Sequence, residues 1–215
     1  MRRLVLVAIG AVALVSVLAL TIGGLVASTR ASAEAVPFYG DATLTPKWDG
    51  TSHRVAPFSL TSQTGATFGD RDLKGRVYVA SFIYTRCSVV CPQLVSSLKR
   101  VQRGVTSANF DIVSFSVTPD LDPPPVLAAF GRERSIDPAR WHLLTGDKSS
   151  IYALARDSYF ANDESLRNSI ASDDAFLHTE KLVLVDQQGR LRGVYDGTLP
   201  REVDMVIADA KALLR

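Results

Sequence analysis

Hydrophobic side chains are distributed in two different ways along this chain of 215 residues. Residues 4–27 form one apolar run without a charged side chain. A helix over this run, at about 1.5 Å per residue, is long enough to cross a bilayer core of roughly 30 Å. Arg2 and Arg3 precede the run, so the positive-inside rule places the N-terminus in the cytoplasm and the remaining chain on the extracytoplasmic side. We therefore predict a single transmembrane anchor over residues 1–28.

A cleaved signal peptide is the alternative for this segment. Ala31, Ser32 and Ala33 fit a cleavage site made of small residues. The apolar run, however, is longer than the roughly 7–15 residues of a signal-peptide core. Its length favours an anchor that stays attached.

After the anchor, the pattern changes to that of a linker and one folded domain. Residues 29–52 are small and polar, with scattered proline and glycine, which predicts a linker. The domain then covers residues 53–215. Apolar and polar side chains alternate over residues 55–75 between glycines, and this predicts a hairpin.

Strand-like and helix-like patterns alternate through the rest of the domain. The apolar runs 76–84 and 109–118 are typical of buried central strands, because they are rich in β-branched and aromatic residues. The order predicts an α/β sheet covered on both faces, with functional sites at the carboxyl ends of its strands. The other predicted elements are a strand over 140–146, two strands over 180–197, and helices over 92–103, 124–134, 148–160 and 200–214.

Composition and charge give little sign of a polyanionic partner. The chain is 47% hydrophobic and 21% charged, with a formal net charge of +2. Three of the 24 basic residues, Arg2, Arg3 and Arg30, lie near the predicted anchor, which leaves 21 basic and 22 acidic residues elsewhere. Such a near-neutral body argues against nucleic-acid binding.

Both cysteines of the chain, Cys87 and Cys91, lie in one bend between a predicted strand and a predicted helix. The helix dipole and the neighbouring Arg86 favour the thiolate form there, and Pro92 suits a first helical turn. Thiolates in this position form a structural disulfide, a redox couple or part of a metal site. A structural disulfide would close a loop of only about five residues and so stabilise the fold little. The spacing does not decide between the redox and metal interpretations.

A metal site needs further ligands, and the chain has three histidines. His53 lies in the polar linker, where we expect it to be solvated. His142 lies in a strand, where we expect it to point at solvent or to form a local hydrogen bond. His178 is the best candidate ligand, because it comes just before a strand late in the chain. Asp173 and Asp174 precede it in what is expected to be a solvated acidic loop.

Two thiolates and one imidazole make a soft set of donors. Structural zinc sites usually have four ligands, and iron–sulfur clusters usually have four cysteines. Copper, as Cu(I) or Cu(II), is the metal that such a set fits best. A methionine-rich copper site is excluded, because the chain contains only Met1 and Met205.

These motifs resemble those of the Sco/SenC family of membrane-anchored copper proteins. The similarity covers roughly residues 55–213 and the anchor. It is carried by "FIYTRCSVVCP" (82–92), "FSVTPDLDPP" (115–124), "WHLLTG" (141–146) and "LHTEKLVLVDQQGRLRGVYDG" (177–197).

The resemblance implies an α/β, thioredoxin-like fold with an added N-terminal hairpin and loop insertions, preceded by one transmembrane helix. It implies copper ligands at Cys87, Cys91 and His178. It also implies delivery of copper to the binuclear centre in subunit II of cytochrome c oxidase, which requires a copper donor and a thiol reductant.

The sequence departs from the family pattern at two positions. Thr118 stands where the family usually has aspartate, and Pro124 stands where threonine is usual. Any role of the missing carboxylate would pass to Asp120 or Asp122. The alternative is that these aspartates only cap backbone N–H groups in their loop.

Two other functions fit the same residues. The first is an extracytoplasmic thiol–disulfide oxidoreductase, with Cys87 and Cys91 as catalytic residues, which keeps the cysteines of the oxidase subunit reduced. The second is a peroxide-reducing enzyme of related fold, although a paired CxxxC is not the pattern of those enzymes. Whether the chain is an enzyme is left open by its sequence.

Overall fold

The computed structural model describes residues 36–86, 90–161 and 180–215. Within these three segments, no helix is long and apolar enough to cross a membrane. The predicted anchor over residues 1–28 lies outside them.

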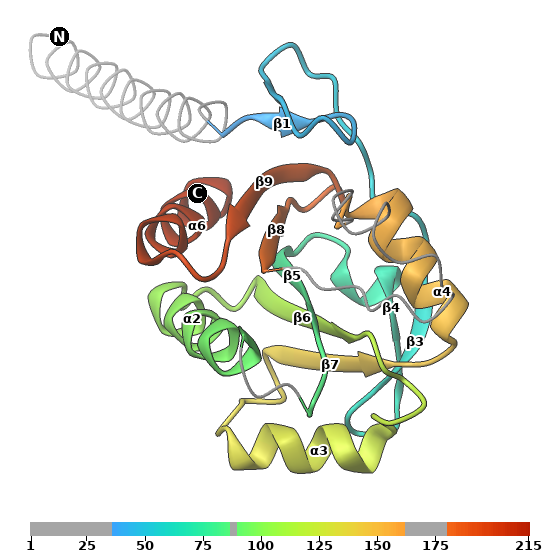
Figure 1. The fold of residues 1–215 in the computed structure, drawn as a ribbon. Helices are drawn as coiled ribbons and strands as arrows, with labels where there is room; N and C mark the ends of the chain where they lie inside the picture. Colours follow the sequence, from blue (N-terminus) through green and yellow to red (C-terminus); the bar gives the residue numbers. More distant parts are fainter. Residues whose placement is uncertain (1–35, 87–89, 162–179) are drawn as a thin grey trace, which may run out of the picture.

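A seven-stranded mixed sheet forms the centre of the domain (Figure 1). Its strands are ordered β4-β3-β7-β6-β5-β8-β9; β5, β6 and β7 run parallel, whereas β3 pairs antiparallel with β7 and β8 pairs antiparallel with β5. This confirms the predicted α/β sheet, including its hairpins β3–β4 and β8–β9. The strands are β3 (Ser59–Ser62), β4 (Thr67–Gly69), β5 (Val77–Ile83), β6 (Phe110–Ser116), β7 (Trp141–Thr145), β8 (Lys181–Val185) and β9 (Leu191–Asp196).

The two central strands are buried along their whole length. All seven residues of β5 and all seven of β6 are buried. Continuous apolar runs of this kind are expected where helices cover both faces of a parallel sheet. Their parallel register, from Val77 beside Phe110 to Ile83 beside Ser116, brings the carboxyl ends of both strands to one edge.

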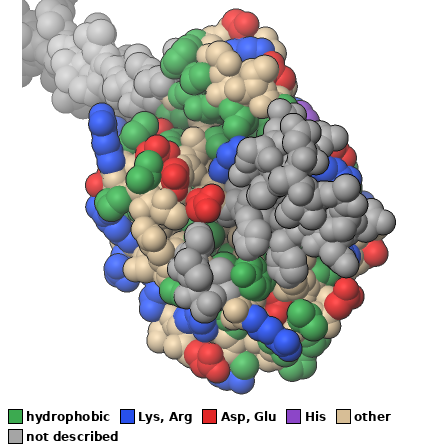
Figure 2. All heavy atoms as spheres, in the orientation of Figure 1, with side chains coloured by type: hydrophobic (Ala, Val, Ile, Leu, Met, Phe, Trp, Pro, Cys, Tyr) green, Lys and Arg blue, Asp and Glu red, His purple; other side chains and the backbone are tan. Residues whose placement is uncertain are grey.

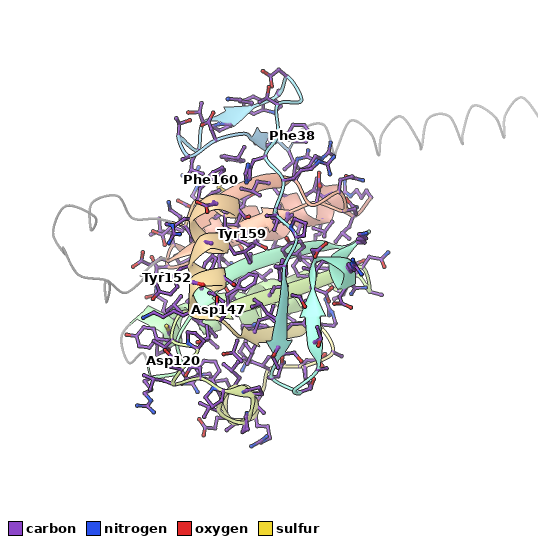
Figure 3. All side chains as sticks on the ribbon, turned by 90° about the vertical axis from the view of Figure 1, so that its right-hand side faces the viewer. Phe38, Asp120, Asp147, Tyr152, Tyr159 and Phe160 are labelled. Carbon is purple, nitrogen blue, oxygen red and sulfur yellow. The ribbon has the colours of Figure 1, made fainter. Side chains whose placement is uncertain are left out.

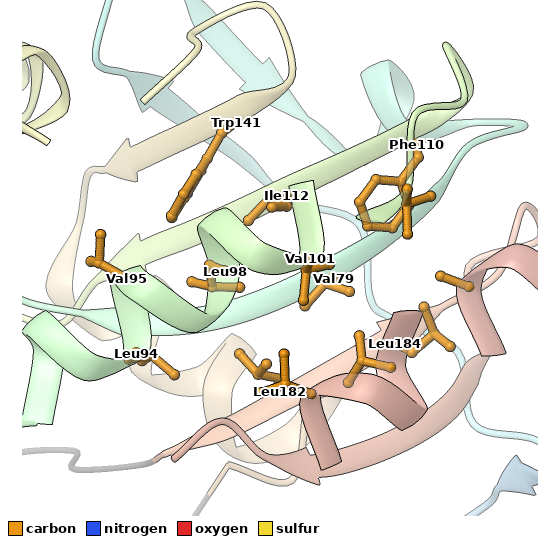
Figure 4. Packing of buried hydrophobic residues seen from close by; sticks show 14 of the residues in the cluster. Val79, Leu94, Val95, Leu98, Val101, Phe110, Ile112, Trp141, Leu182 and Leu184 are labelled. Carbon is orange, nitrogen blue, oxygen red and sulfur yellow. The ribbon is translucent and has the colours of Figure 1, made fainter. Parts of the chain in front are cut away.

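Helices cover the sheet on both faces. One core cluster joins the sheet to α2 (Val90–Gly104), α3 (Pro124–Glu133) and α6 (Pro200–Leu213), with Leu98, Trp141 and Leu184 among its fully buried side chains (Figure 4). A second cluster lies under α4 (Lys148–Ala153), the π-helical turn η2 (Leu154–Ser158) and the 3-10 turn η1 (Asp70–Leu73). The single helix predicted over 148–160 is therefore a short α-helix followed by a π turn.

The segment predicted as a linker contains a folded hairpin. Strands β1 (Phe38–Tyr39) and β2 (Pro46–Lys47) pair antiparallel. Arg192 of β9 donates hydrogen bonds to the carbonyls of Val36 and Pro37, and its guanidinium lies 4.0 Å from the centre of the Phe38 ring. We call residues 36–48 the N-terminal hairpin. A polar composition suggested a linker here, but side chains from the far end of the chain fix it to the domain.

Candidate functional site

The carboxyl ends of β5 and β6 meet at one edge of the sheet, as predicted. The backbone N–H of Val117 donates to the carbonyl of Ile83 at 2.9 Å, which extends the pairing past both strand ends. Tyr152 of α4 donates its hydroxyl to the carbonyl of Val117 at 3.1 Å. Both core clusters therefore support this edge, and the chain passes from it directly toward Cys87.

Helix α2 begins at Val90, two residues before the predicted start at Pro92. Cys91 therefore lies inside the first turn of the helix and is 7% exposed. Proline is tolerated in a first turn because the N–H that it lacks has no partner in the helix there. The thiol of Cys91 is held on a packed helix, at the end where the helix dipole is positive.

The first turn of α2 is fixed by the end of β9. Gln93 donates its side-chain amide to the carbonyl of Thr198 at 2.8 Å, and Leu94 is 1% exposed. Gly197 lies so close to Leu94 that a side chain at position 197 would overlap it. The N–H of Gly197 in turn donates to the carbonyl of Glu180 at 2.7 Å. The start of α2, the end of β9 and the approach to β8 thus meet at one place.

Asp122 is the centre of a hydrogen-bond network at the same edge. Its carboxylate is fully buried and accepts hydrogen bonds from Thr85 N (3.2 Å), Thr85 Oγ1 (2.5 Å), Ser116 Oγ (2.6 Å) and Thr118 Oγ1 (2.9 Å). The network joins the residues that follow β5 to those that follow β6. One of these donors is a backbone N–H, but it belongs to Thr85 in another segment, and the other three are hydroxyl groups, so Asp122 does more than cap N–H groups of its own loop. Asp120 is exposed at the surface (Figure 3).

Of the predicted ligands, the structure describes only Cys91. Cys87 and His178 lie outside the described residues. The described residues include Arg86, which directly precedes Cys87, and Glu180, which is two residues after His178. Within the described part of the chain, no group of three or more His, Cys, Asp or Glu side chains is arranged to hold a metal ion.

The other two histidines lie away from this edge. His142 stacks on Phe68 with 4.2 Å between ring centres, and its Nε2 is 3.6 Å from Asp111 Oδ1. Burial acts to raise the pKa of Asp111, but hydrogen bonds from His142 and Arg76 outweigh it and lower that pKa.

The prediction that His53 is solvated was wrong. Its ring packs on Phe160 with 4.5 Å between ring centres, and its Nε2 is buried and makes no hydrogen bond within the described residues. Its backbone pairs with Tyr39 and Leu191. His53 is therefore half-buried, and because these partners come from distant parts of the sequence, the polar residues around it gave no sign of the contacts.

Charges are mixed on the face shown in Figure 2. Where that face is described, Lys and Arg side chains alternate with Asp and Glu, and neither sign forms a continuous field. This agrees with the near-neutral composition of the chain outside the predicted anchor.

Comparison with known proteins shows one consistent similarity. The SCO1/SenC family model matches residues 47–215. Three solved structures are similar over most of their length. The first is a SCO1/SenC family lipoprotein from Bacillus anthracis str. Ames, 32% identical, covering 76% of this chain and 96% of that one, with a TM-score of 0.67. The second is BsSco, a member of the Sco family of cytochrome c oxidase assembly proteins; a disulfide switch was identified in BsSco. It is 28% identical, covering 77% of this chain and 95% of that one, with a TM-score of 0.64. The third is ScoI of Bradyrhizobium japonicum with copper bound, 27% identical, covering 74% of this chain and 99% of that one, with a TM-score of 0.58.

Proposed function

Because the chain belongs to the SCO1/SenC family, we propose that it is a copper chaperone that acts in the assembly of cytochrome c oxidase. Cys87, Cys91 and His178 bind the copper ion as cargo, and the chaperone delivers it to subunit II of the oxidase. Similarity to a copper-bound ScoI and to an oxidase assembly protein supports the cargo and the process.

The pairing of β5 with β8 is the observation that carries this proposal. These strands are antiparallel, with Tyr78 beside Val185 and Ala80 beside Val183. The carboxyl end of β5, from which the chain continues to Cys87, therefore lies at the same edge as the amino end of β8, which the chain reaches from His178. Cys91 begins α2 at that edge. The topology thus supports the approach of three residues that are up to 91 positions apart (178 minus 87).

The donor set suits copper. Thiolates and imidazole are soft or intermediate ligands that stabilise Cu(I), and three donors leave positions through which a partner's ligands can enter. Transfer then proceeds by replacing these ligands one at a time. A disulfide between the two thiols would prevent binding, so an extracytoplasmic site needs a thiol reductant and a copper donor. The proposed anchor over residues 1–28 holds the copper-binding domain, residues 53–215 with the N-terminal hairpin fixed to it, beside the membrane-bound oxidase.

Copper stoichiometry of purified variants tests the ligand set. Cys87→Ser, Cys91→Ser and His178→Ala should each lower the copper bound per chain. His142→Ala is the matched control, because it removes an imidazole that lies away from the proposed site, and it should bind as the wild type does. Charge-transfer bands from thiolate to Cu(II) should be weaker in both serine variants than in the wild type, because each variant loses one of the two thiolates. Unchanged copper content in all three ligand variants would refute the proposal.

Thiol–disulfide exchange is the second candidate function. It is favoured by the place of Cys91 in the first turn of a helix, where thiolates are stabilised, and by the disulfide switch described for BsSco. His178→Ala separates the two functions. An oxidoreductase needs only the cysteines, so this variant should still reduce a disulfide substrate while losing copper.

A further inference from the structure

We propose that Asp122 is a positioning residue that sets the geometry of the bend carrying both cysteines. The expected effect on copper binding rests on the proposed function, whereas the hydrogen bonds of Asp122 are formed between described residues. Asp122 is 0% exposed and accepts four hydrogen bonds. Three of these bonds are accepted by Oδ2 and one by Oδ1, so both carboxylate oxygens have a donor among the described residues.

The network depends on hydrogen bonds rather than on a paired cation. Among the described residues, no Lys, Arg or His forms an ion pair with Asp122; the ion pairs found there involve other residues. A buried carboxylate without a cation is costly unless its hydrogen bonds are complete. The loss of a single hydroxyl donor should therefore disturb the whole network.

Thr85 is the link between this network and the cysteines. It is two residues before Cys87 and gives Asp122 both its backbone N–H and its hydroxyl. The other end of the bend is fixed independently, because Gln93 and Leu94 hold the first turn of α2. Only residues 86–90 lie between Thr85 and Cys91. Holding both ends of so short a segment restricts the positions that its cysteine can take.

The consequence is preorganisation of a dithiol site by a carboxylate that does not bind the cargo. Residues that orient metal ligands typically change metal affinity by about 10–100-fold when they are replaced. We expect an effect of this size on Cu(I) affinity. In the copper-free protein, we expect a change in thiol reactivity and in the reduction potential of the dithiol, because both depend on the distance and surroundings of the sulfurs.

The test uses the full chain with Asp122→Asn, Thr85→Val and Thr85→Ser. Thr85→Val removes the hydroxyl and keeps the backbone N–H, whereas Thr85→Ser keeps both. Asp111→Asn is the matched control, because Asp111 is also a buried carboxylate, 1% exposed, but lies toward the other end of β6. Readouts are Cu(I) affinity by competition with a chromophoric chelator, the alkylation rate of both thiols without copper, and the midpoint potential in glutathione buffers.

Asp122→Asn and Thr85→Val should weaken Cu(I) binding about 10–100-fold and change alkylation rate and midpoint potential. Thr85→Ser should restore all three, and Asp111→Asn should lower thermal stability with little effect on them. Equal effects of Asp111→Asn and Asp122→Asn, or wild-type values in Thr85→Val, would refute the inference. If Asp122→Asn does not fold, Thr85→Val decides the question. If the wild type does not bind copper, the proposed function is refuted. The alkylation rate and the midpoint potential, both measured without copper, still test the positioning role of Asp122.

A different observation points to a membrane contact. We infer that the N-terminal hairpin presents Trp48 to the lipid surface. Trp48 is 65% exposed, the most exposed large hydrophobic side chain in the described residues. The hairpin projects from the end of the domain that the chain reaches from its N-terminus (Figure 1). Tryptophan is enriched at membrane interfaces, because its ring is apolar and its N–H is polar.

The length of the intervening chain keeps the hairpin close to the bilayer. Eight residues, 28–35, separate the apolar run that ends at Ala27 from Val36. They span at most about 29 Å when fully extended. Arg192 of β9 donates a hydrogen bond to the carbonyl of Val36. The hairpin and the domain therefore keep one orientation relative to each other. Phe38 and Asp120 lie toward opposite ends of the molecule, so this contact would direct the Asp122 end away from the lipid (Figure 3).

Fluorescence of the two tryptophans tests this contact. The full chain is reconstituted into vesicles of dioleoylphosphatidylcholine, with and without a brominated analogue that quenches at the interface. Trp141 is 0% exposed and serves as the internal reference. The difference in emission between the wild type and Trp48→Phe is the emission of Trp48. We expect more than half of that emission to be quenched by brominated lipid, with little quenching in Trp48→Phe. Trp48 emission that is insensitive to bromine but fully quenched by aqueous acrylamide would refute the contact, as would failure of the chain to insert.

Discussion

Replacing Gly197 with alanine should destabilise the place where α2, β8 and β9 meet. A Cβ at position 197 would overlap Cδ1 of Leu94 and lie 2.9 Å from the carbonyl oxygen of Glu180 and 3.0 Å from Cγ of Leu182. Leu94 is 1% and Leu182 0% exposed, so neither side chain has free space into which to move. The glycine is needed for close approach of these elements.

The magnitude follows from two contributions. Overpacking a filled core costs about 1–3 kcal/mol. Relieving the contact requires Gly197 to move away from Glu180, which weakens their 2.7 Å backbone hydrogen bond, worth about 0.5–1.5 kcal/mol. The free energy of unfolding should therefore fall by roughly 2–4 kcal/mol. In a protein of this size, the melting temperature should decrease by about 4–16 °C.

Thermal unfolding followed by circular dichroism measures this change. Gly131→Ala is the matched control, since an added Cβ there meets Leu143 Cδ1 at 3.5 Å and Ile136 Cβ at 3.9 Å, which are ordinary contacts. Gly131 lies within α3, where alanine is favoured over glycine by about 0.5–1 kcal/mol. Gly131→Ala should leave the melting temperature unchanged or raise it.

A second substitution tests the cause of the change. Leu94→Ala alone should cost about 2–5 kcal/mol, because it leaves a cavity. In the Gly197→Ala background it also removes the overlap, so the double variant should be more stable than the sum of the single effects predicts. Strictly additive effects, or a melting temperature of Gly197→Ala within about 1 °C of the wild type, would refute the steric explanation.

Three further predictions concern buried polar pairs. Hydrogen bonds outweigh burial and lower the pKa of Asp111, so its contribution to stability is present above the unfolded-state pKa of about 3.9 and is lost as pH falls through the lower folded-state value. Arg76→Met should accordingly reduce urea stability by about 1–3 kcal/mol at neutral pH and by less near pH 2.5, and equal losses would contradict this. Tyr78 and Tyr159 share a buried hydroxyl hydrogen bond of 3.0 Å, so either Phe variant should cost about 1–3 kcal/mol while the double variant recovers part of the loss. Arg192→Met should expose the N-terminal hairpin to limited proteolysis, and an unchanged cleavage pattern would show that other contacts hold it.

Much of the architecture could be predicted from local sequence patterns. The continuous apolar runs identified β5 and β6, and both are buried throughout. The two strands predicted over 180–197 correspond to the β8–β9 hairpin, whose turn contains Gly189 with a positive φ of 74°. These features depend on side chains within a few positions of one another, and the periodicity of hydrophobic residues records such interactions directly.

Features that depend on distant partners could not be predicted in this way. The N-terminal hairpin is held by Arg192, which is 155 residues after Pro37, and the ring of His53 packs on Phe160. Helix α2 begins two residues earlier than predicted, since its first turn is packed by the end of β9. The partners of Asp122 include Thr85, which is 37 residues away, so the sequence did not indicate which groups its carboxylate bonds.

The sequence by itself determined the chemistry of the candidate site: two thiols in one strand-to-helix bend, one late histidine and an anchor-like apolar segment. The tertiary structure decided which parts of the chain meet. The antiparallel pairing of β5 with β8 brings the segments next to Cys87 and His178 to one edge, and the buried carboxylate of Asp122 fixes the approach to the bend. Residue types are local properties, whereas proximity across many residues depends on strand register and packing, which only the complete fold establishes.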